Sequence, residues 1–202
     1  MITEIDVDGV LLNLDTPLEN MLHSMGYVNF SRQNVKTYDF NKSLDKSKFN
    51  FDVGVPVDII LSCYTKLEIF KHAEIDTEAM NKIRELSRIS NSTFVIHTLS
   101  FTKEIKEFKE NLFYNFFKGC KNIEFIGTTG VEKYSLEKSD NVIEDCHLNF
   151  RDCSEYTQCY LIDKPYNQLK YNDYCRNILL RNNIIRVKNA TEALEKIYNQ
   201  KG

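Results

Sequence analysis

From Thr93 to the C-terminus, short runs of β-branched and apolar residues alternate with amphipathic stretches, and this alternation constrains the fold more than any other feature. Strands that alternate with helices are typical of an open, mostly parallel sheet with helices on its faces. We expect strands at residues 93–96, 122–126, 142–143, 159–162 and 184–187, a helix at 102–118, and a C-terminal helix with a capping box of Asn189 and Glu192. Residues 2–7 supply one more buried strand. The sequence therefore predicts an α/β fold with a Rossmann-like sheet flanked by helices.

A largely helical segment, residues 14–88, separates the first strand from the others. Thr16-Pro17-Leu18-Glu19 has the pattern of a capping box with proline at the first helical position. A second helix is expected to run from Pro56 toward Phe70, and a third to follow Asp76 as its N-cap. We therefore expect this segment to be an insertion after the first strand.

The length of the chain suits a core domain that carries such an insertion. With 202 residues the chain can bury a substantial core. We expect residues 1–13 and 89–202 to form one α/β core domain, with residues 14–88 as a small helical domain inserted into it.

Composition excludes several classes of partner. With a net charge of −3, nothing indicates a nucleic acid polymer or an anionic membrane as the main partner. No apolar run approaches the length of a membrane span, and the sequence has no pattern of a signal peptide. The six cysteines include no Cys-x-x-Cys pair. We therefore expect a cytoplasmic protein with reduced thiols and a small-molecule partner.

Two carboxylates follow each other at alternate positions where the first strand runs into a glycine. Side chains on a strand alternate between its faces, so Asp6 and Asp8 can point the same way, and Gly9 permits a tight turn after them. Carboxylates that converge repel each other, and Mg²⁺, which prefers oxygen ligands, relieves that repulsion. The pair alone predicts a metal site without indicating its purpose.

Polar residues also end the other expected strands. His97, Thr98 and Ser100 follow one strand, and Glu144 and Asp145 follow another. Gly127-Thr128-Thr129-Gly130 and then Lys133 come after a third strand. In open α/β sheets ligands collect at the carboxyl ends of strands. This set offers a nucleophile, metal ligands, a hydroxyl and a cation, which are the components of phosphoryl transfer through an aspartyl-phosphate.

These motifs resemble those of the haloacid-dehalogenase-like phosphohydrolases. Asp6-Val7-Asp8-Gly9-Val10 is similar to the first motif of that superfamily, Val95-Ile96-His97-Thr98 to the second, Lys133 to the third and Ile143-Glu144-Asp145 to the fourth. Within the superfamily, the chain looks most like the 5'(3')-deoxyribonucleotidase family. That likeness rests on the first motif, on Thr37-Tyr38-Asp39-Phe40 and on Ile162-Asp163-Lys164-Pro165-Tyr166-Asn167.

The resemblance implies a role for each matched residue. Asp6 would be the nucleophile, and Asp8 would be the general acid and base that also gives its backbone carbonyl to Mg²⁺. Thr98 and Lys133 would bind the phosphoryl group. Asp145 would complete a metal site of Asp6, Asp8 and Asp145, with Glu144 either beside the metal or bound to it. The segment at 14–88 would be the helical cap that covers the site.

Alternatives remain for several of these residues. Thr98 or Ser100 could instead cap the following helix, with capping the favoured role of Ser100. Lys138 competes with Lys133, although the spacing of Lys133 from Glu144 matches the family better. Asp163, Tyr166 and Asn167 suit either the site or a turn. Five aromatic residues of the insertion could stack on a base or form its core: Phe30, Tyr38, Phe40, Phe49 and Phe51.

The sequence thus leads to the hypothesis of a Mg²⁺-dependent phosphomonoesterase, a 5'(3')-deoxyribonucleotidase that acts on nucleoside monophosphates. One alternative is a phosphatase of the same superfamily for another small phosphoester. Another is a catalytically silent nucleotide binder, which would not need a nucleophile. Polynucleotide end processing is disfavoured by the acidic charge balance. The oligomeric state is left open, a homodimer included.

Overall fold

The computed structural model describes residues 1–36, 55–89, 91–129, 139–171 and 176–199. They form an α/β fold around a six-stranded sheet in the order β5-β4-β1-β6-β7-β8, in which all neighbouring strands are parallel. The strands are β1 (Ile2–Asp6), β4 (Thr93–Ser100), β5 (Ile123–Thr129), β6 (Asn141–Glu144), β7 (Gln158–Ile162) and β8 (Ile184–Val187). The predicted Rossmann-like parallel sheet is confirmed.

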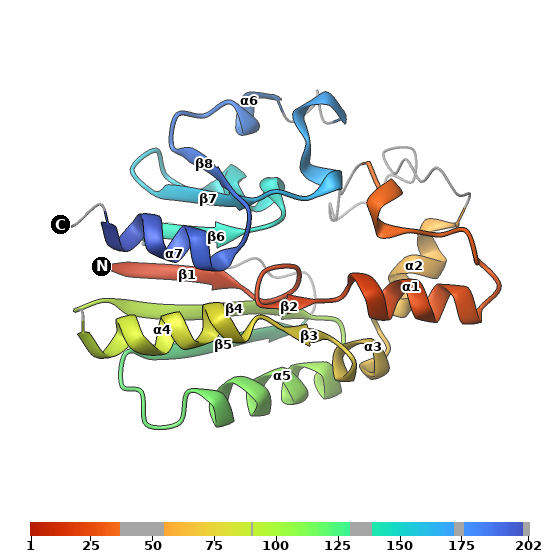
Figure 1. Ribbon diagram of the computed structural model, residues 1–202, viewed down its shortest axis with the longest axis horizontal. Helices are drawn as coiled ribbons and strands as arrows, with labels where there is room; N and C mark the ends of the chain where they lie inside the picture. Colours follow the sequence, from red (N-terminus) through yellow and green to blue (C-terminus); the bar gives the residue numbers. More distant parts are fainter. Residues whose placement is uncertain (37–54, 90, 130–138, 172–175, 200–202) are drawn as a thin grey trace.

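Strand β1 lies in the middle of the sheet. It pairs with β4, where Asp6 is opposite His97, and with β6, where Ile5 is opposite Ile143. Because these strands are parallel, their carboxyl ends meet at one edge of the sheet. That edge faces helices α1 to α3 (Figure 1). The topology therefore places the ends of three adjacent strands against the helical segment.

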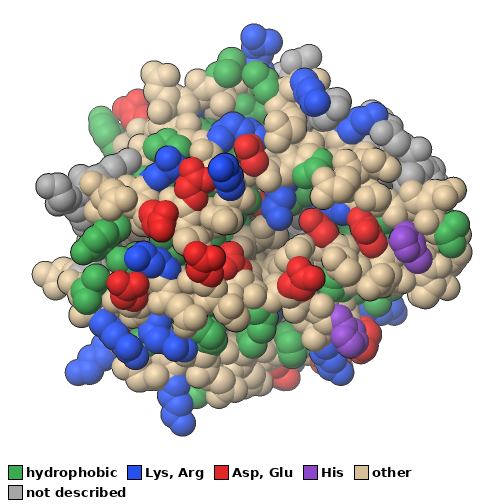
Figure 2. All heavy atoms as spheres, viewed as in Figure 1, with side chains coloured by type: hydrophobic (Ala, Val, Ile, Leu, Met, Phe, Trp, Pro, Cys, Tyr) green, Lys and Arg blue, Asp and Glu red, His purple; other side chains and the backbone are tan. Residues whose placement is uncertain are grey.

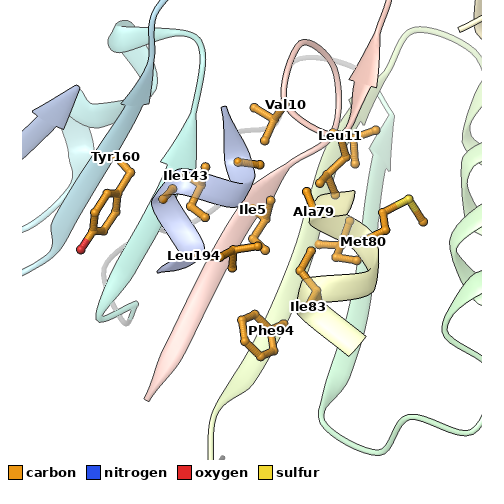
Figure 3. Close-up of a cluster of buried hydrophobic side chains, with 14 of the residues drawn as sticks. Ile5, Val10, Leu11, Ala79, Met80, Ile83, Phe94, Ile143, Tyr160 and Leu194 are labelled. Carbon is orange, nitrogen blue, oxygen red and sulfur yellow. The ribbon is translucent and has the colours of Figure 1, made fainter. Parts of the chain in front are cut away.

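Helices cover both faces of the sheet. They are α4 (Thr77–Ile89), α5 (Lys103–Phe116), α6 (Arg176–Leu179) and α7 (Ala190–Asn199), with the 3-10 helix η4 (His147–Asp152). Ile143 and Tyr160 pack in the main core with residues of α4 and α7 (Figure 3). Val142 and Cys159 point the other way and pack with η4 and α6. This alternation is why strands of a parallel sheet read as continuous apolar runs.

A second cluster of buried side chains belongs to what we call the helical unit. The unit comprises α1 (Asp15–Ser24), η1 (Arg32–Asn34), α2 (Val57–Cys63) and α3 (Leu67–Lys71). Its apolar side chains pack together and also contact Ile105 of α5 and Tyr166. Two short antiparallel strands, β2 (Leu12–Asn13) and β3 (Glu74–Ile75), lie where the chain enters and leaves the unit. The unit is therefore packed onto the sheet domain.

Two expectations about local structure in the helical unit are wrong. The capping box at Thr16 does not form, because α1 begins at Asp15, whose N–H donates to Asn13 Oδ1 at 3.0 Å. Glu19 instead accepts hydrogen bonds from Ser31 Oγ and from the backbone N–H of Arg32. The helix that starts after Pro56 ends at Cys63 rather than continuing, and α3 is a separate helix. In the first case a tertiary contact of Glu19 replaces the local capping pattern, and in the second the helix is interrupted between Cys63 and Leu67.

Helix α4 lies inside the predicted insertion at residues 14–88, yet its buried side chains pack on the sheet. Ala79, Met80 and Ile83 belong to the main core with Ile5 and Phe94 (Figure 3). The separate cluster of the helical unit ends at Phe70 along this part of the chain. The division of the chain into two domains stays a prediction, and the packing favours an end of the insertion before α4.

No helix in the described ranges is long and apolar enough to cross a membrane.

We predict that Asp76 stabilises α4 as its N-cap. Its Oδ1 accepts a hydrogen bond of 2.9 Å from the N–H of Ala79. Replacing a capping side chain by alanine typically costs about 1 kcal/mol. Asp76→Ala should therefore lower the free energy of unfolding by about 1 kcal/mol in chemical denaturation, and Asp76→Asn should restore most of the loss. Glu78→Ala, in the same first turn, is the matched control, and equal losses in both alanine variants would contradict the cap.

Candidate active site

Three adjacent strands bring polar side chains to one edge of the sheet. Asp6 is the last residue of β1, and Glu144 is the last residue of β6 beside it. Thr98 lies on β4, on the other side of β1. On the face drawn in Figure 2, acidic side chains are spread among basic ones, and Glu144 and Asp145 are buried beneath the surface. Of the residues that the sequence selected from strand ends, this edge holds Asp6, Thr98 and Glu144, whereas Lys133 lies outside the described residues.

Asp6, Glu144 and Asp145 form an acidic cluster, with ligand oxygens within 4.8 Å of one another. Burial raises the pKa of Asp6 well above its usual value, and the negative charges of Glu144, Asp145 and Asp8 raise it further. Burial also raises the pKa of Asp145, against the opposing charge of Lys164. Oxygen ligands crowded in this way suit a hard divalent cation such as Mg²⁺. The carboxylate of Asp8 does not belong to this cluster, and its predicted backbone contribution to the metal stays a prediction.

Glu144 is held in place by three donors. Its Oε2 accepts from the backbone N–H groups of Asp145 and Cys146, each at 3.1 Å, and its Oε1 accepts from Asn149 Nδ2 at 2.6 Å. The side chain is buried. The contact with Asn149 ties the following loop to the acidic cluster.

Asp145 is fixed by residues from the segment after β7. The hydroxyl of Tyr166 donates to its Oδ2, and Asn167 Nδ2 donates to its backbone carbonyl at 2.9 Å. Both residues lie in the 3-10 helix η5 (Pro165–Asn167). Asp163, by contrast, forms an ion pair of 2.6 Å with Arg186. Of the three residues that the sequence left between site and turn, Tyr166 and Asn167 therefore support the site.

Gly9 allows the turn after β1 to approach Asp145. Its φ of 85° lies in the left-handed region that glycine tolerates, and a Cβ at this position would collide with Oδ2 of Asp145. The glycine of the first motif is therefore needed for two reasons, backbone conformation and contact with the acidic cluster.

Lys109 is a buried cation at the site that the sequence interpretation missed. Its ammonium donates to Asp8 Oδ2 at 2.6 Å, to Thr98 Oγ1 at 2.9 Å and to the carbonyl of Leu99 at 3.3 Å. The exposed fraction of its side chain is 0%. It comes from α5, which follows β4. A lysine buried this completely is rare unless it is paired, and here the partner is Asp8.

A signal for Lys109 is present in the sequence. Ile105, Lys109 and Phe113 are four residues apart, so they lie on one face of a helix, and all three are buried. A lysine on the apolar stripe of an amphipathic helix breaks the pattern. A lysine at such a position needs a buried acceptor, and in the structure Asp8 is that acceptor.

The helical unit contributes further groups. Arg32 is buried, pairs with Asp15 Oδ1 at 3.1 Å and lies 4.3 Å from the ring centre of Tyr166. Burial raises the pKa of Tyr64 to about 12, so its phenol stays protonated near neutral pH. The ring centre of Phe70 lies 4.7 Å from the ammonium of Lys109. Groups from the unit thus touch the side chains that hold Asp8 and Asp145.

The remaining predicted residues have different outcomes. Lys133 and its competitor Lys138 lie outside the described residues, as do Tyr38, Phe40, Phe49 and Phe51. Phe30 is buried in the core of the helical unit, so the alternative of a core residue holds for it. Neither Thr98 nor Ser100 caps α5, because Thr102 does so through the N–H of Ile105. His97 Nδ1 lies 3.9 Å from Oε2 of Glu4.

No family model matches the chain, and no curated protein matches it. The functional interpretation therefore rests on the motifs and on the geometry of the site.

We predict that a divalent cation stabilises this protein through the acidic cluster. A raised pKa of Asp6 means that the folded state holds this proton more tightly than the unfolded state. In metal-free buffer, stability should therefore fall as the pH rises through that raised pKa. Mg²⁺ at about ten times its Kd should add roughly 1.4 kcal/mol, or about 3–6 °C in Tm, and should do so more in mildly alkaline than in mildly acidic buffer.

Asp145→Asn tests this in calorimetry, with and without Mg²⁺. The variant removes one like charge, so its metal-free Tm should equal or exceed that of the wild type, and most of the Mg²⁺-dependent rise should be lost. Asp163→Asn, outside the cluster, should keep the full rise. A full rise in Asp145→Asn would remove the cluster as the cation site.

Proposed function

We propose that the protein is a Mg²⁺-dependent phosphomonoesterase that acts through an aspartyl-phosphate on Asp6, with nucleoside monophosphates as its substrates. The observation that carries the proposal is that two carboxylates, one at the end of β1 and one just after it, are held in different ways. Asp6 belongs to the acidic cluster, whereas Asp8 is bound by a buried lysine. A binding protein would not require this division between a cluster carboxylate and a separately held one.

The residues present fit a magnesium ion. Asp6, Glu144 and Asp145 offer carboxylate oxygens close enough to share one cation. The raised pKa of Asp6 reflects burial first and then the negative charge of its neighbours, which a cation would offset. When bound, Mg²⁺ would neutralise charge on the phosphoryl group and orient it toward Asp6.

The proposed reaction has two steps, the formation of the aspartyl-phosphate and its hydrolysis. In the first, Asp6 forms a bond to phosphorus while the bond from phosphorus to the leaving oxygen breaks, and Asp8 gives its proton to that oxygen. In the second, Asp8 takes a proton from water, which attacks phosphorus and releases phosphate, so that Asp6 is regenerated. Thr98 would donate its hydroxyl hydrogen to a phosphoryl oxygen during both steps.

A cleft between the helical unit and η5 could hold a polar leaving group. Its volume is about 360 Å³, and it is lined by Gln33, Asn34, Val35, Lys36, Pro165, Gln168 and Lys170. Two of these residues, Gln33 and Pro165, are chain neighbours of Arg32 and Tyr166, and the hydroxyl of Tyr166 donates to Asp145. Small-molecule sites commonly measure about 300–1,000 Å³ and use a few placed polar groups for specificity. Amides and lysines suit the hydrogen-bonding edges of a nucleotide base and its sugar.

Phosphate release from a panel of nucleoside monophosphates and sugar phosphates tests the proposal. The wild type should turn over nucleotides with Mg²⁺ and lose activity with a chelator. Asp6→Asn should lower kcat by at least about a thousandfold, because the nucleophile is lost. Glu107→Gln is the matched control and should retain the wild-type rate, since the side chain of Glu107 is 56% exposed and pairs with Lys103 on α5.

Other outcomes separate the alternatives. Turnover of sugar phosphates without nucleotides would contradict the nucleotidase assignment and leave the phosphatase chemistry. No turnover of any phosphoester, with Mg²⁺ bound, would contradict the enzyme and favour the silent nucleotide binder.

A further inference from the structure

Lys109 has no N–H group left for a substrate. A lysine ammonium carries three hydrogens, and here they serve Asp8 Oδ2, Thr98 Oγ1 and the carbonyl of Leu99. The side chain is fully buried, with the ring of Phe70 4.7 Å away. A phosphoryl oxygen could reach this ammonium only by displacing one of these acceptors. Lys109 is therefore arranged to hold protein groups.

The contact with Asp8 makes its two carboxylate oxygens different. Oδ2 accepts from Lys109 at 2.6 Å. Oδ1 is buried and has no hydrogen-bond partner among the residues that the structure describes. A buried carboxylate oxygen without a donor destabilises the fold, so its presence calls for a functional explanation. Oδ1 is thus the oxygen that is left to carry a proton to or from a reacting group.

The contact with Thr98 restricts the direction of its hydroxyl. Oγ1 accepts from Lys109 at 2.9 Å, so one lone pair is occupied and the hydroxyl hydrogen must point elsewhere. In the structure it points to the carbonyl of Leu99 at 3.3 Å, which is long for an O–H···O hydrogen bond. A phosphoryl oxygen would be a better acceptor than this carbonyl.

We propose that Lys109 is a positioning residue, which binds Oδ2 of Asp8 so that Oδ1 faces the leaving oxygen, and which binds Thr98 so that its hydroxyl donates to the phosphoryl group. This inference rests on the proposed phosphomonoesterase function. It differs from the role expected of Lys133, which is to bind the phosphoryl group itself.

Dependence on the leaving group distinguishes this role from a structural one. p-Nitrophenolate leaves without a proton, whereas the alkoxide of a nucleoside needs the proton of Asp8. Single-turnover release of each leaving group, with enzyme in excess over p-nitrophenyl phosphate or a nucleoside monophosphate, measures the first step alone. In Lys109→Gln, nucleoside release loses the effect of both contacts and should slow by about 100-fold, whereas p-nitrophenolate release loses only the effect of the Thr98 contact and should slow far less.

A matched control and a second variant keep the test decisive. Lys106→Met, on the same helix, removes a side chain that is 33% exposed and pairs with Glu110, and it should leave both rates unchanged. Lys109→Arg keeps the charge and a donor, so it should recover part of the nucleoside rate even if Lys109→Gln folds poorly. Rates are referred to folded protein by circular dichroism.

Each outcome has one meaning. Equal slowing of both substrates in Lys109→Gln and Lys109→Arg would overturn the inference and place Lys109 at the nucleophile or the phosphoryl group. Unchanged rates would overturn it as well. If the wild type releases neither leaving group, the proposed function fails and the inference fails with it, whereas wild-type release with equal slowing in the variants contradicts the inference alone.

Discussion

Repulsion among the carboxylates at the end of β1 is the constraint on which the rest of the site depends. Burial raises the pKa of Asp6 most, and the charges of Glu144, Asp145 and Asp8 raise it further. The protein offsets this charge unevenly. Lys109 neutralises Asp8, while Lys164, Tyr166 and Arg32 act on Asp145 in the direction that lowers its pKa. At Asp6, burial and three neighbouring carboxylates raise the pKa although Lys109 acts to lower it, so a cation bound there would relieve the repulsion.

The parallel sheet makes this crowding unavoidable. Because β4, β1 and β6 are neighbours, every polar residue at their carboxyl ends is forced onto one edge. An antiparallel neighbour would bring its amino end there instead. The turn at Gly9 then adds Asp8 without moving Asp145 away, since only a residue without a Cβ fits against Oδ2 of Asp145. The strand order and the glycine at position 9 together crowd the carboxylates, and buried cations partly neutralise them.

Features set by strand periodicity could be predicted from the sequence, and features set by tertiary contacts could not. The places of Asp6, Thr98 and Asp145 at or near the ends of β1, β4 and β6 follow from short apolar runs whose length and alternation are local properties, although β4 continues two residues beyond Thr98. Glu19 failed as a capping residue because Ser31 and Arg32, which are distant in sequence, use its carboxylate. Lys109 was missed although its place on the apolar stripe of α5 was visible. A buried charge can be noticed from sequence, but its partner can be identified only from the fold.

Two cation–π contacts between the helical unit and residues outside it show how the site is assembled. Phe70 of α3 packs over the ammonium that binds Asp8, and Arg32 of η1 packs over the ring of Tyr166, whose hydroxyl binds Asp145. Each contact joins the unit to a group that holds one site carboxylate, and neither touches Asp6. If the unit moved away from the sheet, Lys109 and Tyr166 would become solvated, and their interactions with Asp8 and Asp145 would weaken as the local dielectric rose. The electrostatic asymmetry between Asp6 and its neighbours is therefore a property of the packed assembly of sheet and helical unit, and the sheet alone does not produce it.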